Sequence, residues 1–450
     1  MLSVVLFLVG PVKVLAENYY THDRSGNFVA WDYSYNMLNF AEPNGIIFTN
    51  GDNDTFPLWY LQEVENIRPD VRVANLSLLN TPWYIKQLKH KEPKVPMTFT
   101  DDQIENISLM PWPKEQTFEV PVVPEEVRAA EAQQYRLAFN LDTLDIPRTM
   151  SFKVKPKKIY IGGGRYANVL RVQDVMILNI LTANQFRKPL YFAVTTSTQN
   201  QLNELRKYLR MDGLLFKITT IPGWEMDPET LYKNIMNFKY RGLNDPEVYF
   251  NRNITGLLQN YRTAFFRLAN YYLTARKQER FREVMAKAYE VMPPEVIPFT
   301  NAQLEQIMTG YALLAGILPP DTLRTEAFDL RKLQGIGQMA AHYEAYDLAR
   351  IALETLLERI ESNPTGPEVD AFLAAAISRP ELYASASENL KNDLRKRILG
   401  SIRRQLLRVY KEVGDTAAAV MFLERWQEAD PENEFAKKEL EKLKTEQPEE

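Results

Sequence analysis

The sequence predicts an α/β domain with a small Rossmann-like sheet, followed by an all-α domain of tetratricopeptide-like repeats. Between residues 44 and 222, apolar runs typical of buried strands alternate with helical segments. From residue 227 onward the pattern is helical and recurs with a long period. The predicted domains are therefore residues 17–225 and 226–445, with an apolar segment at 1–16 and a solvated tail at 446–450.

The composition limits the classes of protein and of site. Hydrophobic residues make up 45% of the 450 residues and the formal charge is -4, so we expect a folded chain without a nucleic-acid partner. The absence of cysteine excludes disulfides, thiolate metal sites and cysteine catalysis. The three histidines, His22, His90 and His342, lie far apart and lack the spacing of a zinc-binding helix.

The first sixteen residues, MLSVVLFLVGPVKVLA, are almost entirely apolar. They are shorter than the roughly 20 residues of a membrane helix and lack the basic start of a secretion signal. They fit a weak signal peptide ending at Ala16, or the trailing half of a membrane span. A buried core element is the third alternative. The first two place the following residues beside or across a membrane.

A βαβ unit is the first predicted element of the sheet. Residues 28–40 have helical spacing and lead into the apolar run Ile46–Thr49, which we predict to be a buried strand. Residues 56–64 have helical composition, and residues 71–79 form a second strand-like run. Between the first strand and its helix, residues 50–55 form a predicted acidic loop. In parallel sheets ligands bind outside the carboxyl ends of the strands, where this loop would lie.

A long irregular insertion with short strands or turns, residues 86–150, is rich in proline and polar residues and is expected to cover a site or dock a partner. The sheet pattern then resumes. We predict strands at residues 151–160, 168–172, 189–195 and 214–220, and helices at 175–186 and 201–209. Asp174 is a candidate cap for the helix at 175–186.

The helical region carries a repeat. Apolar and small residues recur at similar offsets before Pro293, Pro364 and Pro431, which are 71 and 67 residues apart. Both separations are close to twice 34, the period of tetratricopeptide repeats, whose concave face binds peptides. A helical solenoid or an irregular bundle is the more general expectation.

The acidic loop is the sharpest candidate for chemistry. Asp52, Asn53, Asp54 and Thr55 follow the first strand, and two carboxylates one residue apart can hold a divalent cation against a diphosphate. Asp52 and Asp54 are thus the candidate metal ligands, and a divalent cation is the one cofactor considered. The alternative is an ordinary turn in which Asp54 or Thr55 caps the next helix.

Further candidates follow the next strands. Asn75, Trp83 and Tyr84 would line the same edge, where the two aromatic residues stack on a sugar or pack in the core. Arg165 ends a glycine-rich turn that could present backbone N–H groups and a guanidinium to a phosphate, or simply connect a hairpin. Arg171, at a strand-to-helix junction, could close on the acidic loop or pair with a helix cap.

Three stretches resemble a known family: IIFTNGDNDTFPLWYLQEVENIRPDVRVANLSLLNTPWYI, DRSGNFVAWDYSYNML and LRVQDVMILNIL. They resemble the soluble C-terminal region of a bacterial membrane-protein family, formerly of unknown function, related to protein O-mannosyltransferases and to a vertebrate homologue with tetratricopeptide repeats. Such proteins are similar to polytopic glycosyltransferases that move a sugar from a lipid phosphate to a protein hydroxyl. The catalytic acid of that class lies in an early loop between membrane helices.

The resemblance implies an extracytoplasmic, non-catalytic module that binds or positions the protein acceptor beside the membrane part of the enzyme. Residues 1–16 look like the end of the last span, so no catalytic residue is carried over to this chain. Two alternatives remain. One is a stand-alone, metal-dependent glycosyltransferase using the GDNDT loop, and the other is a free-standing repeat adaptor.

Overall fold

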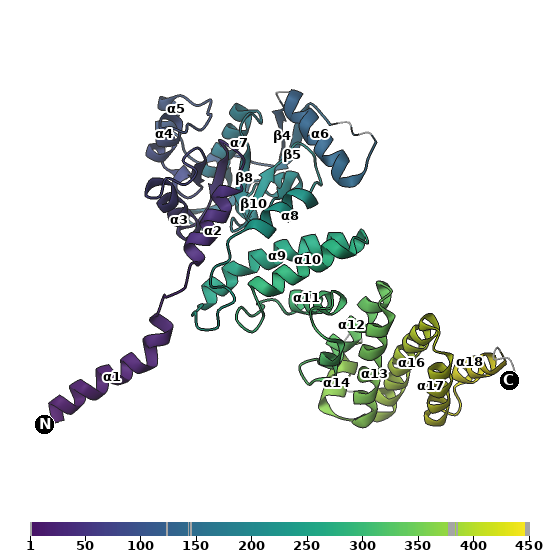
Figure 1. Ribbon diagram of the computed structural model, residues 1–450. Coiled ribbons are helices and arrows are strands. Elements are labelled where there is room, and N and C mark those ends of the chain that lie inside the picture. The colour runs from purple at the N-terminus through teal and green to yellow at the C-terminus, as the bar shows by residue number, and fades with distance from the viewer. Residues whose placement is uncertain are drawn as a thin grey trace. The chain divides into compact units, whose positions relative to one another are not determined.

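The computed structural model describes residues 2–122, 125–142, 144, 146–376, 383 and 386–445 (Figure 1). The chain divides into two compact units, Met1–Thr300 and Asn301–Glu450. The predicted boundary at 225/226 follows the change in secondary structure, whereas the units divide 75 residues later along the chain, after three further helices. The predicted tail, 446–450, lies outside the described residues.

The main sheet of the first unit has five strands in the order β2-β1-β8-β10-β9. Strand β1 (Ile46–Thr49) pairs in parallel with β2 (Arg72–Asn75) and with β8 (Leu190–Ala193). Strand β10 (Leu215–Ile218) is antiparallel to both β8 and β9 (Leu209–Met211). The predicted α/β layer is confirmed, and its likeness to a Rossmann sheet stays a prediction.

The apolar runs are explained by burial on both faces of the sheet. All four residues of β1 and all four of β8 are buried. Ile46 and Phe48 join the larger core cluster together with Met176 and Ile177 of α7 (Val172–Asn184). Strands covered on both sides read as continuous apolar runs, which is why local sequence revealed them.

The acidic segment is part of a helix. Helix α3 spans Asp52–Glu63, with extended Gly51 as its N-cap, whereas the sequence predicted a loop up to Thr55 and a helix from Phe56. The βαβ unit itself is confirmed, because β1 and β2 are parallel and flank α3. Upstream, α2 (Val29–Asn39) closely matches the predicted helix at 28–40.

Several predicted boundaries differ. The strand expected at 151–160 is two strands, β5 (Thr149–Val154) and β6 (Lys157–Gly162), separated at Lys155 and Pro156. The helix expected at 201–209 is two 3₁₀ turns, η2 (Thr198–Asn200) and η3 (Asn203–Tyr208). Arg171 is the N-cap of α7, and Asp174, the predicted cap, occupies the third helical position and accepts from the Arg171 N–H at 3.0 Å.

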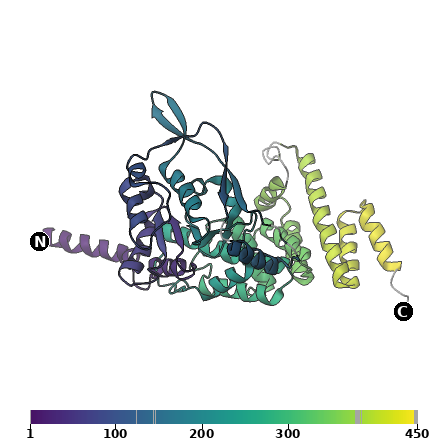
Figure 2. The same cartoon turned by 90° about the horizontal axis from the view of Figure 1, so that it is seen from above.

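The insertion contains regular structure. Before it lies η1 (Leu78–Asn80), and α4 (Pro82–His90) runs into its start. The elements within it are α5 (Asp101–Glu105), β3 (Met110–Pro111), β4 (Gln116–Pro121) and α6 (Glu125–Phe139). Strand β4 pairs with β5, and β3 joins β7 (Arg165–Leu170) and β6 in a three-stranded sheet. The β6–β7 hairpin projects from the rest of the unit (Figure 2).

The remaining elements are helical. The first unit ends with α8 (Pro228–Asn237), α9 (Arg252–Thr274) and α10 (Gln278–Val291). The second unit contains α11 (Ala302–Leu314), η4 (Pro320–Arg324), α12 (Leu330–His342), α13 (Tyr346–Ser362), α14 (Pro367–Ala375), α16 (Glu388–Val413), α17 (Thr416–Ala429) and α18 (Glu434–Thr445). The helical content of residues 226–445 agrees with the predicted all-α region.

Three helix pairs share one backbone conformation. The turns of α9–α10, α12–α13 and α16–α17 each place one residue in the left-handed region: Arg276, Glu344 and Gly414, with φ of 56°, 62° and 77°. The helix that follows each turn ends at a C-cap with φ between -145° and -141°. Proline follows each C-cap directly, at Pro293, Pro364 and Pro431. The long period of the sequence is therefore a period of helix–turn–helix geometry, and the tetratricopeptide assignment stays a prediction.

Candidate functional site

The carboxyl ends of β1, β2 and β8 meet at one edge of the main sheet. Thr55, on α3, accepts a hydrogen bond at its hydroxyl oxygen from the Asn75 amide at 2.8 Å and donates to the Gly51 carbonyl oxygen at 2.6 Å. Its hydroxyl also lies 2.8 Å from that of Thr49. Thr55 and Asn75 are both buried, so this pair fixes the start of α3 to the ends of β1 and β2.

The two carboxylates of the GDNDT segment have different surroundings. Asp54 is only 7% exposed and accepts a hydrogen bond from the Thr195 hydroxyl at 2.6 Å, while Asp52 and Asn53 are exposed. Residues two apart on a helix do not share a face. Among the described residues, no group of three or more histidine, cysteine, aspartate or glutamate side chains is placed to hold a metal ion. The cation at Asp52 and Asp54 stays a prediction.

Arg171 is linked to the same edge through the side chain of Asn200. Its guanidinium donates to both carboxylate oxygens of Asp174, at 2.9 and 2.8 Å, and to the Asn200 side-chain oxygen at 2.8 Å. The Asn200 amide in turn donates to the Asn50 side-chain oxygen at 2.7 Å. Arg171 therefore pairs with the start of its helix and is linked to Asn50 only through Asn200, so direct closure of Arg171 on the acidic segment stays a prediction.

Arg165 is not brought to this edge. It begins β7, whose partners β6 and β3 belong to a separate sheet, and its side chain is exposed. The glycine turn before it, Gly162–Gly164, has positive φ at all three positions and open space around each. The hairpin alternative describes its geometry, and a phosphate contact of Arg165 stays a prediction.

Of the two aromatic residues expected at this edge, Tyr84 packs in the core and Trp83 is exposed. Tyr84 is 3% exposed; its hydroxyl accepts from the Asn75 N–H at 3.0 Å and donates to the Val73 carbonyl oxygen at 3.3 Å. The phenol therefore covers the open edge of β2, and burial raises its pKa. Trp83 is 58% exposed, so its indole is free to meet a ligand.

A groove of about 700 Å³ lies along this edge of β2. Trp59, Trp83 and Tyr84 line it together with Arg72 and Glu63. Burial lowers the pKa of Arg72; its Nη1 donates to the Glu92 carbonyl oxygen at 3.3 Å, and its buried Nε has no hydrogen-bond partner among the described residues. Exposed indole and partly unpaired guanidinium groups are typical of surfaces that bind peptides or sugars.

Comparison with known proteins points to one family. Residues 30–158 and 134–229 match the family model described as TMEM260-associated domain 2. A stretch of 81 residues is 27% identical to the "Protein O-mannosyl-transferase tmem260" of Dictyostelium discoideum, and it covers 18% of this chain and 10% of that relative. No solved structure matches the chain significantly.

The matched region, residues 30–229, contains the whole five-stranded sheet and the groove. The match supports the predicted relation to protein O-mannosyltransferases, and the bacterial part of the resemblance stays a prediction. In the part of the chain that the structure describes, no helix is both long and apolar enough to cross a membrane.

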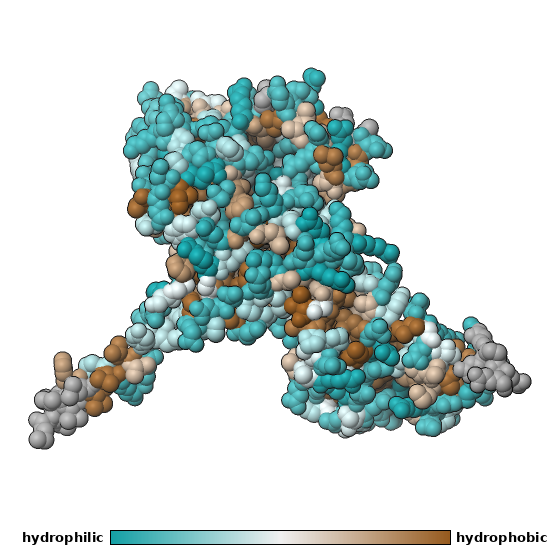
Figure 3. Space-filling model, in the orientation of Figure 1, coloured by the Kyte–Doolittle hydropathy of each residue, from teal (hydrophilic) through white to brown (hydrophobic). Residues whose placement is uncertain are grey.

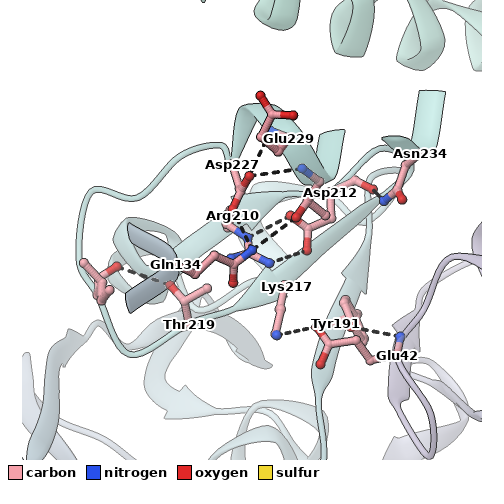
Figure 4. Close-up of polar contacts among 12 residues, drawn as sticks. Glu42, Gln134, Tyr191, Arg210, Asp212, Lys217, Thr219, Asp227, Glu229 and Asn234 are labelled. Atoms are coloured by element: carbon pink, nitrogen blue, oxygen red, sulfur yellow. Dashed lines mark hydrogen bonds and ion pairs between the residues drawn. The ribbon is translucent and has the colours of Figure 1, made fainter. Parts of the chain in front are cut away.

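A buried polar network in the matched region was not predicted from the sequence (Figure 4). Arg210 and Asp212 form an ion pair through two N–O contacts of 2.8 Å, and both side chains are buried. Arg210 Nη1 also donates to Gln134 Oε1 of α6 at 3.2 Å, and the Gln134 amide donates to Asp227, the N-cap of α8, at 2.6 Å. The network joins α6 and α8 to the edge strand β9.

The pKa of Arg210 is raised by its surroundings. Burial, the largest influence, lowers the pKa of the guanidinium, but the charge and hydrogen bonds of Asp212, with Asp227 and Glu131 farther away, outweigh it. The guanidinium also lies over the Trp224 ring, 4.1 Å from its centroid. These contacts are structural, and they hold the elements behind the candidate site in place.

Three residues important to the edge carried no pattern in the sequence. Thr195, Thr196 and Asn200 follow β8 and reach the ends of β1 only because β8 is its neighbour. A correct prediction of strand order, with β8 beside β1, would have been enough to find them.

Proposed function

We propose that this chain is an extracytoplasmic, non-catalytic module of a protein O-mannosyltransferase-like membrane glycosyltransferase, and that it binds or positions the protein acceptor. The match to the TMEM260-associated domain supports the link to O-mannosyl transfer. The observation that carries the acceptor role is the groove beside β2, which is lined by both the exposed Trp83 and the partly unpaired Arg72. The partners are then an acceptor protein and the membrane part of the enzyme.

The groove suits an extended peptide. Its volume of about 700 Å³ is within the range of ligand sites. Indole and phenol rings supply apolar contact at low entropic cost, while Arg72 and Glu63 can bind main-chain or hydroxyl groups. A serine- or threonine-bearing segment presents both kinds of surface.

The proposed location rests on α1 (Leu2–His22). Among its described side chains, Phe7, Val12, Val14 and Leu15 are each more than half exposed (Figure 3). Exposed apolar side chains on one helix favour contact with a membrane or a membrane partner. We propose that α1 brings the module to the extracytoplasmic membrane surface.

Binding of labelled serine- and threonine-rich peptides to the full chain, followed by fluorescence polarisation, tests the acceptor role. We expect Trp83→Ala to weaken binding at least tenfold, because it removes the exposed indole of the groove. Tyr166→Ala is the matched control, since Tyr166 is likewise an exposed aromatic residue, on the β6–β7 hairpin outside the groove. Equal affinities for the two variants would overturn the proposal.

The stand-alone enzyme alternative makes a different prediction. It requires Mn²⁺-dependent binding of a nucleotide sugar that is abolished when Asp52 and Asp54 are both changed to alanine. Titration calorimetry with each nucleotide sugar, with and without Mn²⁺, measures this directly. On our proposal neither the wild type nor the double variant binds, and Mn²⁺-dependent binding by the wild type alone would favour the enzyme.

A further inference from the structure

A second cavity, here called the β8 pocket, lies in the first unit and encloses about 550 Å³. Thr196 and Thr198, which follow β8, line it together with Arg206 and Lys207 of η3 and Arg267 of α9. It is thus built where the chain leaves the carboxyl end of a parallel strand, the usual position of ligand sites in α/β sheets. Its lining shares no residue with the groove beside β2.

The guanidinium of Arg267 is the first indication of a ligand. Arg267 is half-buried, and among the described residues it makes no hydrogen bond and no ion pair. Burial lowers its pKa, Glu225 only partly compensates, and the nearby charge of Arg206 lowers the pKa further. A partly desolvated cation next to a like charge is unfavourable unless an anion joins them.

The charge of the lining is the second indication. Arg206, Lys207 and Arg267 bring three positive charges to the β8 pocket, and Glu225 is the one acidic residue in its lining. Neither Arg206 nor Lys207 has an ion-pair partner within the described part of the chain, and the Lys207 amine lies over the Tyr208 ring at 5.3 Å. The lining therefore carries a net charge of about +2, which a dianion would neutralise.

The hydrogen-bond donors around the β8 pocket favour a tetrahedral oxyanion over other anions. Two guanidinium groups can each offer paired N–H donors to a tetrahedral oxyanion, and an ammonium group adds a point charge. Thr198 is an exposed residue of the lining and can add a hydroxyl donor. A planar carboxylate could accept hydrogen bonds from only some of these guanidinium, ammonium and hydroxyl donors.

We propose that the β8 pocket binds a phosphate-bearing ligand, a phosphate monoester or a diphosphate, through Arg206, Lys207 and Arg267. The phosphate belongs either to a soluble phosphorylated compound or to a lipid headgroup. This site goes beyond the acceptor role proposed above and does not depend on it, because neither Trp83 nor Arg72 contributes to the β8 pocket.

Isothermal titration of the full chain with inorganic diphosphate tests the site. We expect saturable 1:1 binding that sulfate competes for weakly. Arg267→Gln should weaken binding at least tenfold, and Arg267→Lys should restore part of it. Arg252→Gln, on an exposed arginine at the start of the same helix, is the matched control and should change affinity less than twofold.

A second variant guards against loss of folding. Arg206 and Lys207 are exposed, so changing both to glutamine leaves the core intact and should weaken diphosphate binding to a similar extent. No saturable binding by the wild type, or equal affinities for Arg252→Gln and both of these variants, would overturn the proposal.

Vesicle sedimentation distinguishes the two sources of the phosphate. Vesicles of phosphatidylcholine with phosphatidic acid present a phosphate monoester, and vesicles with phosphatidylserine at matched charge do not. Tighter binding to the first than to the second, with the difference lost in Arg267→Gln, assigns the site to a lipid headgroup. Diphosphate binding without such a difference between the vesicles assigns it to a soluble compound. Trp83→Ala should leave diphosphate affinity unchanged, so the acceptor proposal and this one can fail separately.

Discussion

Breaking the buried Arg210–Asp212 pair should destabilise the first unit strongly. Arg210 is 1% and Asp212 is 6% exposed, so neither charge can be resolvated when its partner is removed. Loss of one member of a buried, hydrogen-bonded ion pair typically costs about 3–5 kcal/mol. We expect Arg210→Met to fall in the upper part of that range, because it also removes the contacts with Gln134 and the Trp224 ring.

The double variant, Arg210→Met with Asp212→Asn, measures the coupling between the two charges apart from their other contacts. Asp212→Asn should cost about 3 kcal/mol, and the combination with Arg210→Met should cost at least about 2 kcal/mol less than the sum of the two, because the remaining charge is no longer left unpaired. Lys94→Met is the control. It removes an exposed ion pair with Glu92 in the same unit and should cost at most about 0.5 kcal/mol.

Urea unfolding followed by tryptophan fluorescence measures these free energies. Five of the six tryptophans lie in the first unit, so the signal reports mainly on that unit. If Arg210→Met shifts the free energy of unfolding no more than Lys94→Met does, the ion pair is not the stabilising feature that its burial indicates. Strict additivity of the two substitutions would refute the coupling.

Three further predictions concern other parts of the chain. Tyr84→Phe should destabilise the first unit by about 1–2 kcal/mol in the same urea assay, because it removes the hydroxyl that bonds the β2 backbone twice. Arg68 forms a hydrogen-bonded ion pair with Asp70 and holds the pKa of Asp70 at about 2 instead of 3.8. The stabilisation of the folded state by this ion pair is therefore present above about pH 4 and is lost as pH falls from about 4 to 2. Allowing for solvent screening it is about 1 kcal/mol, and Asp70→Asn should flatten the stability profile measured by urea titration across that range. Gly337→Val should lower the melting temperature of the second unit in calorimetry, because the Cβ alone would lie 2.8 Å from Leu353 Cδ2.

The local sequence pattern was sufficient to predict the βαβ unit. The run at residues 46–48 is continuous and apolar because its strand is buried on both faces, and the buried Val73 and Ala74 mark the next strand. The start of α3 was missed for a local reason as well. Gly51, Asp52 and Asn53 are typical turn residues, and the first turn of a helix favours acidic side chains for its dipole, so both structures have similar sequences there.

The polar contacts were beyond local reasoning. Arg210 lies between two apolar residues of β9, which is the alternation expected for a solvent-facing side chain. Its burial depends on α6 and α8, whose places are set by packing that no short segment encodes. Likewise, Asn200 and Thr195 contact the GDNDT segment only because β8 lies beside β1 instead of beside β2.

The position of β1 between β2 and β8 also bears on how the chain folds during synthesis. Ile46 pairs with Arg72 on one side and with Leu190 on the other, so the second partner emerges roughly 140 residues after the first strand. At ribosomal rates of about 5–20 residues per second, β1 then waits on the order of ten seconds with one row of backbone groups unpaired. An early intermediate with β1 and β2 joined and an unprotected edge is the expected consequence, and such an edge is a surface that chaperones recognise and that aggregation exploits.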